Sequence, residues 1–179
     1  RFDGVRDFIR SRGIELPEGI PEDPPQTETV CGLGNRKNDL VNEVIESVGV
    51  DAYESTITLA REIRDAGIKI AVVTSSQNCD AVLKAAKIED LFNVRVDGNT
   101  ILEQHLSGKP APDSYLEGAK RLGVDPKRSV VVEDAISGVQ AGRNGKFGLV
   151  IGVDRKGNAE ELKKNGADVV VKDLGEFLG

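Results

Sequence analysis

The chain has 179 residues, of which 39% are hydrophobic, 30% charged and 4% aromatic, with no Met and no Trp. This length fits one domain of ordinary size with a small appendage, and the composition excludes a disordered or fibrous protein. The formal net charge of −6 argues against a nucleic-acid partner, because binding to the phosphate backbone rests on clustered Lys and Arg.

No stretch of the chain approaches the roughly 18 to 20 consecutive apolar residues of a membrane span. The first residues are too charged for a signal peptide, so we expect a cytoplasmic protein without a membrane partner. Cys31 and Cys79 are then expected to be unpaired thiols. The chain opens on Arg1 rather than Met, and we expect it to be a fragment, cleaved from or fused to a longer chain.

The first fifty residues have a helical pattern. Residues 1–14 carry apolar side chains at helical spacing before Gly13, which predicts a short amphipathic helix. Residues 15–30 hold four of the seven prolines and are predicted to form a loop. Residues 36–48 are predicted to form a second helix with one apolar face, made by Leu40, Val41, Val44, Ile45 and Val48.

From about residue 53 the chain alternates helix and strand patterns. Helices are predicted over residues 54–66, 77–87, 113–122, 136–143 and 158–164. Strands are predicted over residues 68–73, 94–96, 129–134, 147–153 and 168–171. Such alternation is typical of an α/β protein with a doubly wound parallel sheet, and it predicts a mostly helical segment over 1–50 and an α/β core over 51–179.

In such folds ligands bind beyond the carboxyl ends of the strands. The first buried strand is followed by a polar turn, residues 74–78, in which Thr74, Ser75 and Asn78 could join free backbone N–H groups in binding an anion. The alternative is that a serine of this turn only caps the next helix.

Two further loops carry charged candidates. Glu133 and Asp134 are adjacent carboxylates at the end of a buried strand, where their repulsion calls for a cation such as Mg²⁺; alternatively, one of them caps the following helix. Lys109 lies in a stiff loop with two prolines and could meet a phosphate, or could serve solubility alone. Hydroxyls, a lysine and a carboxylate pair together indicate Mg²⁺-dependent phosphoryl transfer.

The same residues resemble three motifs of the haloacid dehalogenase superfamily, specifically its β-phosphoglucomutase-like branch. The segments that carry the resemblance are IAVVTSSQN, GKPAPDSYLEGAKRLGV and VVVEDAISGVQAG, in that order along the chain. The resemblance implies a Rossmann-like core over residues 51–179 and a partial helical cap over residues 1–50.

The resemblance also implies roles for individual residues. Thr74 would bind the transferring phosphoryl group, with Ser75 and Asn78 beside it, and Lys109 would neutralise the phosphoryl oxygens. Asp134, together with Glu133, would hold Mg²⁺.

The helix that begins near residue 36 is similar to the last helix of the family's cap. By that similarity Lys37 and Asn38 would contact a distal phosphate or a sugar hydroxyl, and the partner would be a small phosphorylated sugar.

One motif of the family has no counterpart in these residues. The family's nucleophile and general acid/base lie in an Asp-x-Asp-Gly sequence after a strand, and the nearest string here is Arg1-Phe2-Asp3-Gly4. Asp3 opens a predicted helix, where Asp is common, so we do not expect it to be catalytic. The strand that carries the motif is central in the family's sheet. Its two neighbours are therefore expected to lack a hydrogen-bonding partner.

Three functions fit these observations. The first is Mg²⁺-dependent hydrolysis of a small sugar phosphate through an aspartyl-phosphate in the full-length protein. The second is a phosphomutase of the β-phosphoglucomutase type, and the third is a non-catalytic phosphate-binding domain. The only histidine, His105, has no partner at suitable spacing for nucleophilic or metal chemistry, and we expect it on a surface loop.

Overall fold

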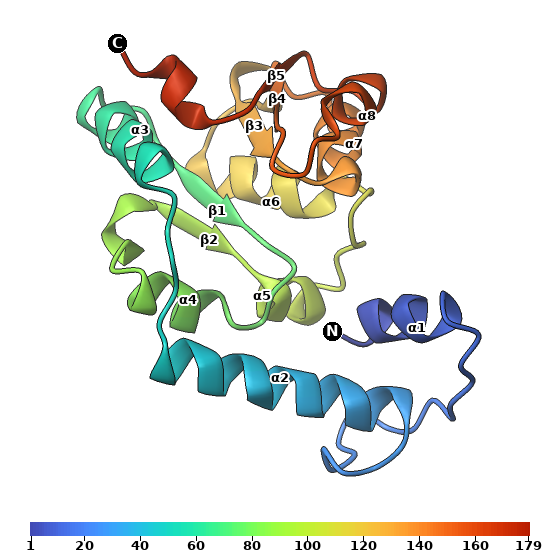
Figure 1. Ribbon diagram of the computed structural model, residues 1–179. Coiled ribbons are helices and arrows are strands. Elements are labelled where there is room, and N and C mark those ends of the chain that lie inside the picture. The colour runs from blue at the N-terminus through green and yellow to red at the C-terminus, as the bar shows by residue number, and fades with distance from the viewer. The chain divides into compact units, whose positions relative to one another are not determined.

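The computed structural model describes all 179 residues, which form two compact units, Arg1–Val50 and Asp51–Gly179 (Figure 1). None of the helices combines the length and the apolar character that crossing a membrane requires. Cys31 and Cys79 are both buried free thiols.

The first unit consists of two helices, α1 (Phe2–Arg10) and α2 (Val30–Ser47), joined by the proline-rich loop. Val5, Ile9 and Val30 form its small core. Helix α2 begins at Val30 rather than at the predicted residue 36, because the Thr29 hydroxyl caps it by accepting a hydrogen bond from the Gly32 amide at 2.9 Å.

The apolar face predicted for residues 36–48 is present on α2, but within this unit it has no covering partner. Leu40, Val44 and Val48 are exposed, Val48 to 81%. The helical spacing therefore identifies the helix correctly, whereas this face is not part of the unit's core.

The second unit is an α/β fold with parallel strands. Strand β1 (Ala71–Val73) pairs with β2 (Val94–Val96), and β4 (Leu149–Val153) lies between β3 (Val130–Glu133) and β5 (Val169–Val171). In register, Val73 pairs with Val96 and Glu133 with Gly152. The α/β class and the parallel pairing predicted from the sequence are confirmed.

The strands form two separate sheets, β1-β2 and β3-β4-β5, rather than one continuous sheet. Strands β1 and β3 each have a single strand partner, β2 and β4 respectively. The side chains of Val130 and Val132 on β3 are exposed. Strand β1 is also shorter than the strand predicted over residues 68–73. Just before it, the Ile70 amide donates to the Asn93 side chain, and the Ile70 carbonyl accepts from the Asn93 amide.

Helices cover both sheets. They are α3 (Glu54–Asp65), α4 (Cys79–Ala85), α5 (Gly98–Glu103), α6 (Asp113–Leu122), α7 (Ile136–Asn144) and α8 (Ala159–Lys164). Short 3₁₀ turns complete the unit at Glu89–Leu91, Pro126–Arg128 and Leu174–Phe177. The pattern did not predict α5, which is only six residues long and is capped by the Asp97 carboxylate.

The main core lies where α6, α7 and α8 pack against the strands. Helix α6 contacts β1 and β2, while α7 packs on β3 and β4 and α8 on β4 and β5. The buried side chains of this core come from α6, α7 and α8, from β3 and β4, and from the segments that precede β4 and β5. They are Tyr115, Ala119, Val131, Val139, Ala141, Phe147, Val150, Leu162 and Ala167. Val73 of the other sheet packs against the same cluster.

Leu162 provides a test of this core. Because its side chain is fully buried, Leu162→Ala is expected to lower the free energy of unfolding by about 2–5 kcal/mol through lost burial and a residual cavity. Leu102→Ala is the matched control, since Leu102 is exposed and its truncation is expected to change stability by less than about 0.5 kcal/mol. Urea denaturation followed by circular dichroism measures both, and equal losses would contradict the assignment of Leu162 to the core.

Candidate functional site

The candidate site is organised around the carboxylate of Glu133 at the end of β3. Its Oε1 accepts hydrogen bonds from Lys109 Nζ at 2.6 Å and from the Tyr115 hydroxyl at 3.0 Å. Its Oε2 accepts from the backbone amides of Asp134 at 2.8 Å and Ala135 at 3.0 Å. A carboxylate offers about four lone-pair positions, so these four donors occupy all of them.

Lys109 reaches this carboxylate from a loop that is fixed on both sides. The Ser107 amide donates to the Asp113 carboxylate at 3.0 Å, and the Asn144 side chain donates to the Pro110 carbonyl at 3.0 Å. The Lys109-Pro110 peptide bond is cis. The side chains of Lys109 and Glu133 are only 13% and 12% exposed, so their ion pair is largely shielded from water.

Burial and charge act in opposite directions on Glu133. Burial raises the pKa of its carboxyl, while the Lys109 charge and the hydrogen bonds from Lys109, Ala135 and Tyr115 lower it. The Lys109 charge and the hydrogen bonds outweigh the effect of burial, so the pKa of Glu133 lies below its ordinary value. Glu133 is therefore ionised at neutral pH and balances the Lys109 ammonium.

Tyr115 takes part in the cluster in two ways, and the sequence patterns did not identify it as a functional residue. Its hydroxyl donates to Glu133, and its ring centroid lies 4.6 Å from Lys109 Nζ, within the range of a cation–π interaction. Burial and the nearby Glu133 charge raise the pKa of Tyr115, which keeps it a neutral donor. The feature of the sequence that could have indicated this role is its position in the first turn of α6, directly after the loop that carries Lys109.

Gly138 is a second residue whose role the sequence left open. A Cβ atom at this position would overlap the Glu133 carboxylate, with Oε1 as its nearest atom. Any side chain there would displace the carboxylate from its donors. The glycine in the ED-x₃-G sequence therefore makes room for the buried carboxylate on the first turns of α7.

Helix α6 brings the ends of three strands together. Tyr115 contacts Glu133 at the end of β3, and a Cβ at Gly118 would lie 3.2 Å from Val73 and 4.0 Å from Val96, the last residues of β1 and β2. Residues 115 and 118 are separated by about 4.5 Å along the helix axis. The segments that follow all three strands, including Thr74, therefore lie near the same part of α6.

The polar turn after β1 is held by its own hydroxyl groups. The Thr74 amide donates to the Val96 carbonyl at 2.9 Å, and Thr74 Oγ1 accepts from the Ser76 amide at 3.1 Å. Ser76 Oγ in turn accepts from the amide of Asn78, the N-cap residue of α4. Ser75 is exposed. The hydroxyl groups thus stabilise the turn itself, and no side chain caps α4. Thr74 and Ser75 lie in the segment that directly follows β1.

Asp134 is exposed beside the buried cluster, and its backbone amide is one of the Glu133 donors. Because all lone pairs of Glu133 are in use, Asp134 is the carboxylate of this pair that could bind a metal ion. The chain contains no group of three or more His, Cys, Asp or Glu residues that could hold one. Mg²⁺ usually keeps several waters and is bound through one or two protein carboxylates, so Asp134 is the candidate ligand of this pair.

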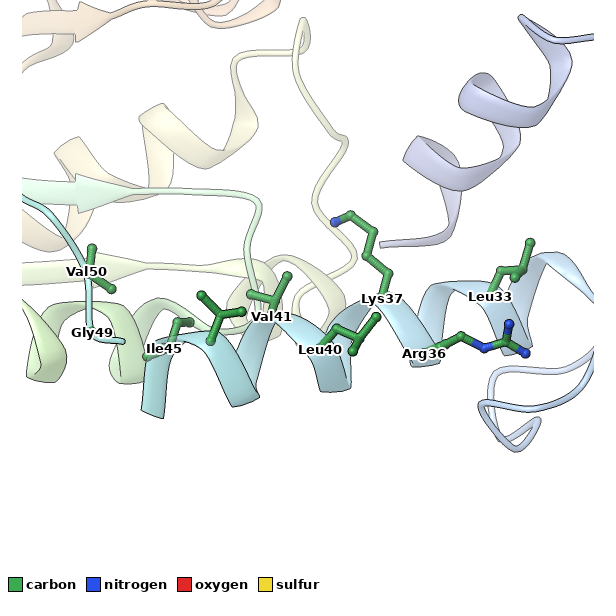
Figure 2. Close-up of a pocket in the computed structure, with 9 residues that line it drawn as sticks. Leu33, Arg36, Lys37, Leu40, Val41, Ile45, Gly49 and Val50 are labelled. Carbon is green, nitrogen blue, oxygen red and sulfur yellow. The ribbon is translucent and has the colours of Figure 1, made fainter. Parts of the chain in front are cut away.

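Lys37 and Asn38, the residues expected to contact a substrate, lie on α2 in the first unit. Lys37 lines an apolar groove of about 600 Å³ along that helix, beside Leu33, Leu40 and Val41 (Figure 2). The Asn38 side chain accepts a hydrogen bond from Arg1 at 3.1 Å. His105 lies exposed at the end of α5 with a positive φ of 53°.

The fold and the cluster define a class: an α/β protein with parallel strands whose strand ends hold a buried Lys–Glu pair beside a hydroxyl-rich turn. A comparison with protein families gives the more specific identification. The model for haloacid dehalogenase-like hydrolases matches residues 2–146, which is well over half of the chain. The chain belongs to this family of enzymes.

Individual relatives agree with this assignment. The chain is 47% identical over 181 residues to a β-phosphoglucomutase from Mycobacterium bovis, a match that covers 99% of this chain and 69% of that protein. It is 40% identical over 129 residues to a trehalose-phosphate phosphatase from Mycobacterium leprae, covering 70% of this chain and 28% of the relative. The crystal structure of a β-phosphoglucomutase from Clostridium difficile has a similar fold, with a TM-score of 0.80 at 24% identity over 98% of this chain and 72% of that one.

Neutralising Glu133 tests the buried ion pair. Glu133→Gln leaves the Lys109 ammonium without a counter-charge and is expected to lower the free energy of unfolding by about 3 kcal/mol at neutral pH. Asp134→Asn is the matched control, because this neighbouring carboxylate is exposed and its neutralisation is expected to change stability by less than about 0.5 kcal/mol.

The pH dependence gives the same test a second readout. Because the pKa of Glu133 is lower in the folded chain than the ordinary 4.5, its contribution is complete above pH 4.5 and is lost as the pH falls below that value. Between pH 7 and pH 3 the unfolding free energy of Glu133→Gln is therefore expected to fall less than that of the unsubstituted chain, as measured by urea denaturation. Parallel curves would show that Glu133 is not held ionised by its neighbours.

Proposed function

We propose that the cluster around Lys109 binds the phosphoryl group of a small sugar phosphate in a phosphoryl-transfer reaction. The observation that carries the proposal is the position of the Lys109 ammonium, which a fixed loop and a buried carboxylate hold near the ends of three strands. An ammonium has three N–H donors, and Glu133 accepts one of them. The remaining donors are available to phosphoryl oxygens, whose charge the ammonium offsets.

Thr74 and Ser75 are proposed to supply further hydrogen bonds to the same group. Thr74 directly follows β1, whose last residue Val73 lies against α6, the helix whose Tyr115 contacts Glu133. Ser75 is exposed in the same turn. We propose that Asn78, at the start of α4, completes this set. These residues would bind and orient the phosphoryl group, and Lys109 would stabilise the charge that develops during transfer.

The nucleophile of the reaction is not supplied by a recognisable motif of these residues. Residues 1–179 contain no Asp-x-Asp-Gly sequence, and Asp3 lies in α1 in a hydrogen bond with Arg6. For the chain of these residues we therefore propose binding of the phosphoryl group, without transfer. Mg²⁺ dependence is proposed for the whole enzyme, with Asp134 as one ligand.

The first unit is proposed to act as a helical cap that recognises the sugar. Lys37 borders the apolar groove on α2, and Asn38 follows it in the same turn (Figure 2). A cationic group beside an apolar surface suits a phosphorylated sugar, which presents charge, hydroxyl groups and C–H faces. Asn38 does not line the groove, and its side chain accepts a hydrogen bond from Arg1. The division of the chain at Val50 supports treating this unit separately from the core.

Two reactions fit this site, and the relatives favour one of them. A phosphatase releases inorganic phosphate, as the name of the 40% identical trehalose-phosphate phosphatase indicates for that protein. A phosphomutase moves the group to another position of the sugar, and the 47% identical relative that covers nearly all of this chain is a β-phosphoglucomutase. We therefore propose a sugar phosphomutase first and a sugar phosphatase second for the whole enzyme.

Calorimetric titration with inorganic phosphate tests the binding proposal on the chain of residues 1–179. We expect binding that Lys109→Ala weakens at least tenfold, because the substitution removes the ammonium that offsets the phosphate charge. Lys120→Ala is the control, since Lys120 lies exposed on α6 and pairs only with Glu117 at the surface. Equal affinities of the two variants would contradict the proposal.

Turnover assays with β-D-glucose 1-phosphate and with p-nitrophenyl phosphate separate the alternatives. The chain of residues 1–179 is expected to turn over neither compound, and measurable hydrolysis would show that it carries its own nucleophile. For the whole enzyme, glucose 6-phosphate as the product identifies the mutase, whereas free glucose with inorganic phosphate identifies the phosphatase.

A further inference from the structure

Tyr115 contacts both partners of the buried ion pair through its side chain. Its hydroxyl shares the acceptor Oε1 with Lys109 Nζ, and the same ammonium lies 4.6 Å from its ring centroid. Tyr115 is itself 8% exposed and is fixed from behind by an edge-to-face contact with Phe147, with centroids 6.0 Å apart. A rigid aromatic side chain therefore lies between the hydrophobic core and the charged pair.

We propose that Tyr115 is a positioning residue that sets how strongly Glu133 holds Lys109, and thereby how available Lys109 is to a phosphoryl group. The inference rests on the proposed function in one respect, since it takes a phosphoryl group as the ligand of Lys109. It does not depend on the identity of the sugar or on the outcome of the transfer.

The hydroxyl acts on Lys109 through their shared acceptor. With Tyr115 present, Oε1 divides its hydrogen bonding between a neutral donor and the ammonium. Without the hydroxyl, a largely buried carboxylate oxygen has Lys109 as its only donor, because the two backbone amides bind Oε2. The ammonium then has to satisfy this oxygen alone, and it is bound more tightly to Glu133.

The ring acts by a separate contact. Its face attracts the ammonium by a cation–π interaction and fills the space beside the lysine. Removing the ring leaves a cavity next to Lys109 and removes the edge contact with Phe147. The lysine is then less confined, which is the opposite of the effect expected from removing the hydroxyl alone.

Two substitutions separate these effects. Tyr115→Phe keeps the ring and removes the hydroxyl, while Tyr115→Leu removes both. Tyr53→Phe is the matched control, because Tyr53 is the only other tyrosine of the chain and its exposed ring stacks on Arg155 away from this cluster. Each variant is first examined for cooperative thermal unfolding, so that only folded protein is compared.

Two measurements are made on the chain of residues 1–179. The first is the affinity for inorganic phosphate by calorimetry. The second is the rate at which acetic anhydride acetylates Lys109, quantified by mass spectrometry of the peptide, because acylation requires the amine to leave the carboxylate. The second measurement needs no ligand, so it tests the positioning role even if phosphate does not bind.

We expect Tyr115→Phe to weaken phosphate binding about three- to tenfold and to slow the acetylation of Lys109. Tyr115→Leu is expected to accelerate acetylation, because the ammonium is no longer confined, and to weaken phosphate binding at least as much, because a mobile ammonium is no longer oriented toward the phosphate. Tyr53→Phe is expected to change neither. A merely structural role would instead accelerate acetylation in both Tyr115 variants. The inference is overturned if Lys109 is acetylated faster in both Tyr115 variants, or if both are acetylated at the rate of the unsubstituted chain.

The two proposals fail in different ways. If the unsubstituted chain does not bind phosphate while acetylation is slowed in Tyr115→Phe and accelerated in Tyr115→Leu, the phosphoryl-binding proposal is overturned and the positioning of Lys109 by Tyr115 stands. If phosphate binds with the expected loss in Lys109→Ala but both Tyr115 variants behave like Tyr53→Phe, the proposed function stands and the role of Tyr115 is overturned.

Discussion

The saturated carboxylate of Glu133 is the interaction on which the rest of the site depends. It joins the loop that carries Lys109, the first turn of α6 through Tyr115, and the turn after β3 through two backbone amides. Burying a charge is costly unless it is paired and hydrogen-bonded, and here every lone pair has a donor. The geometry of three segments that are distant in sequence is therefore fixed by one side chain, and Gly138 leaves the space in which it lies.

The separation of the strands into two sheets shows what holds the α/β unit together. No ladder hydrogen bonds run between β1 and β3, and the valines of β3 at 130 and 132 are exposed. Side-chain packing takes the place of sheet pairing, because α6 contacts β1 and β2 while its Tyr115 and Ala119 enter the cluster that contains Val131. The close approach of Gly118 to Val73 and Val96 allows this helix to lie directly on the two-stranded sheet.

The sequence predicts most helices and strands because continuous apolar runs and helical spacing are local properties. It does not predict α5, which is too short for a periodic signal, or the start of α2, where a cap and glycines replace apolar spacing. Lys109 and Glu133 are each candidates from the sequence, but their contact is not, because 24 positions separate them and only the fold brings them together. The role of Tyr115 is not predicted for another reason. Helical spacing does not distinguish an aromatic residue that only packs in the core from one that also orients a charged group.

The two adjacent carboxylates illustrate how the structure resolves an electrostatic problem that the sequence poses. Their repulsion at a strand end requires a cation, and the pattern alone suggests a metal ion. In the folded chain the Lys109 ammonium supplies positive charge to Glu133, while Asp134 turns outward and remains exposed. Adjacent residues of the same chemical type thus have different roles, because one lies among four donors and the other faces solvent. A ligand that binds here therefore meets an ammonium whose charge is already partly balanced, and it has to compete with Glu133 for Lys109.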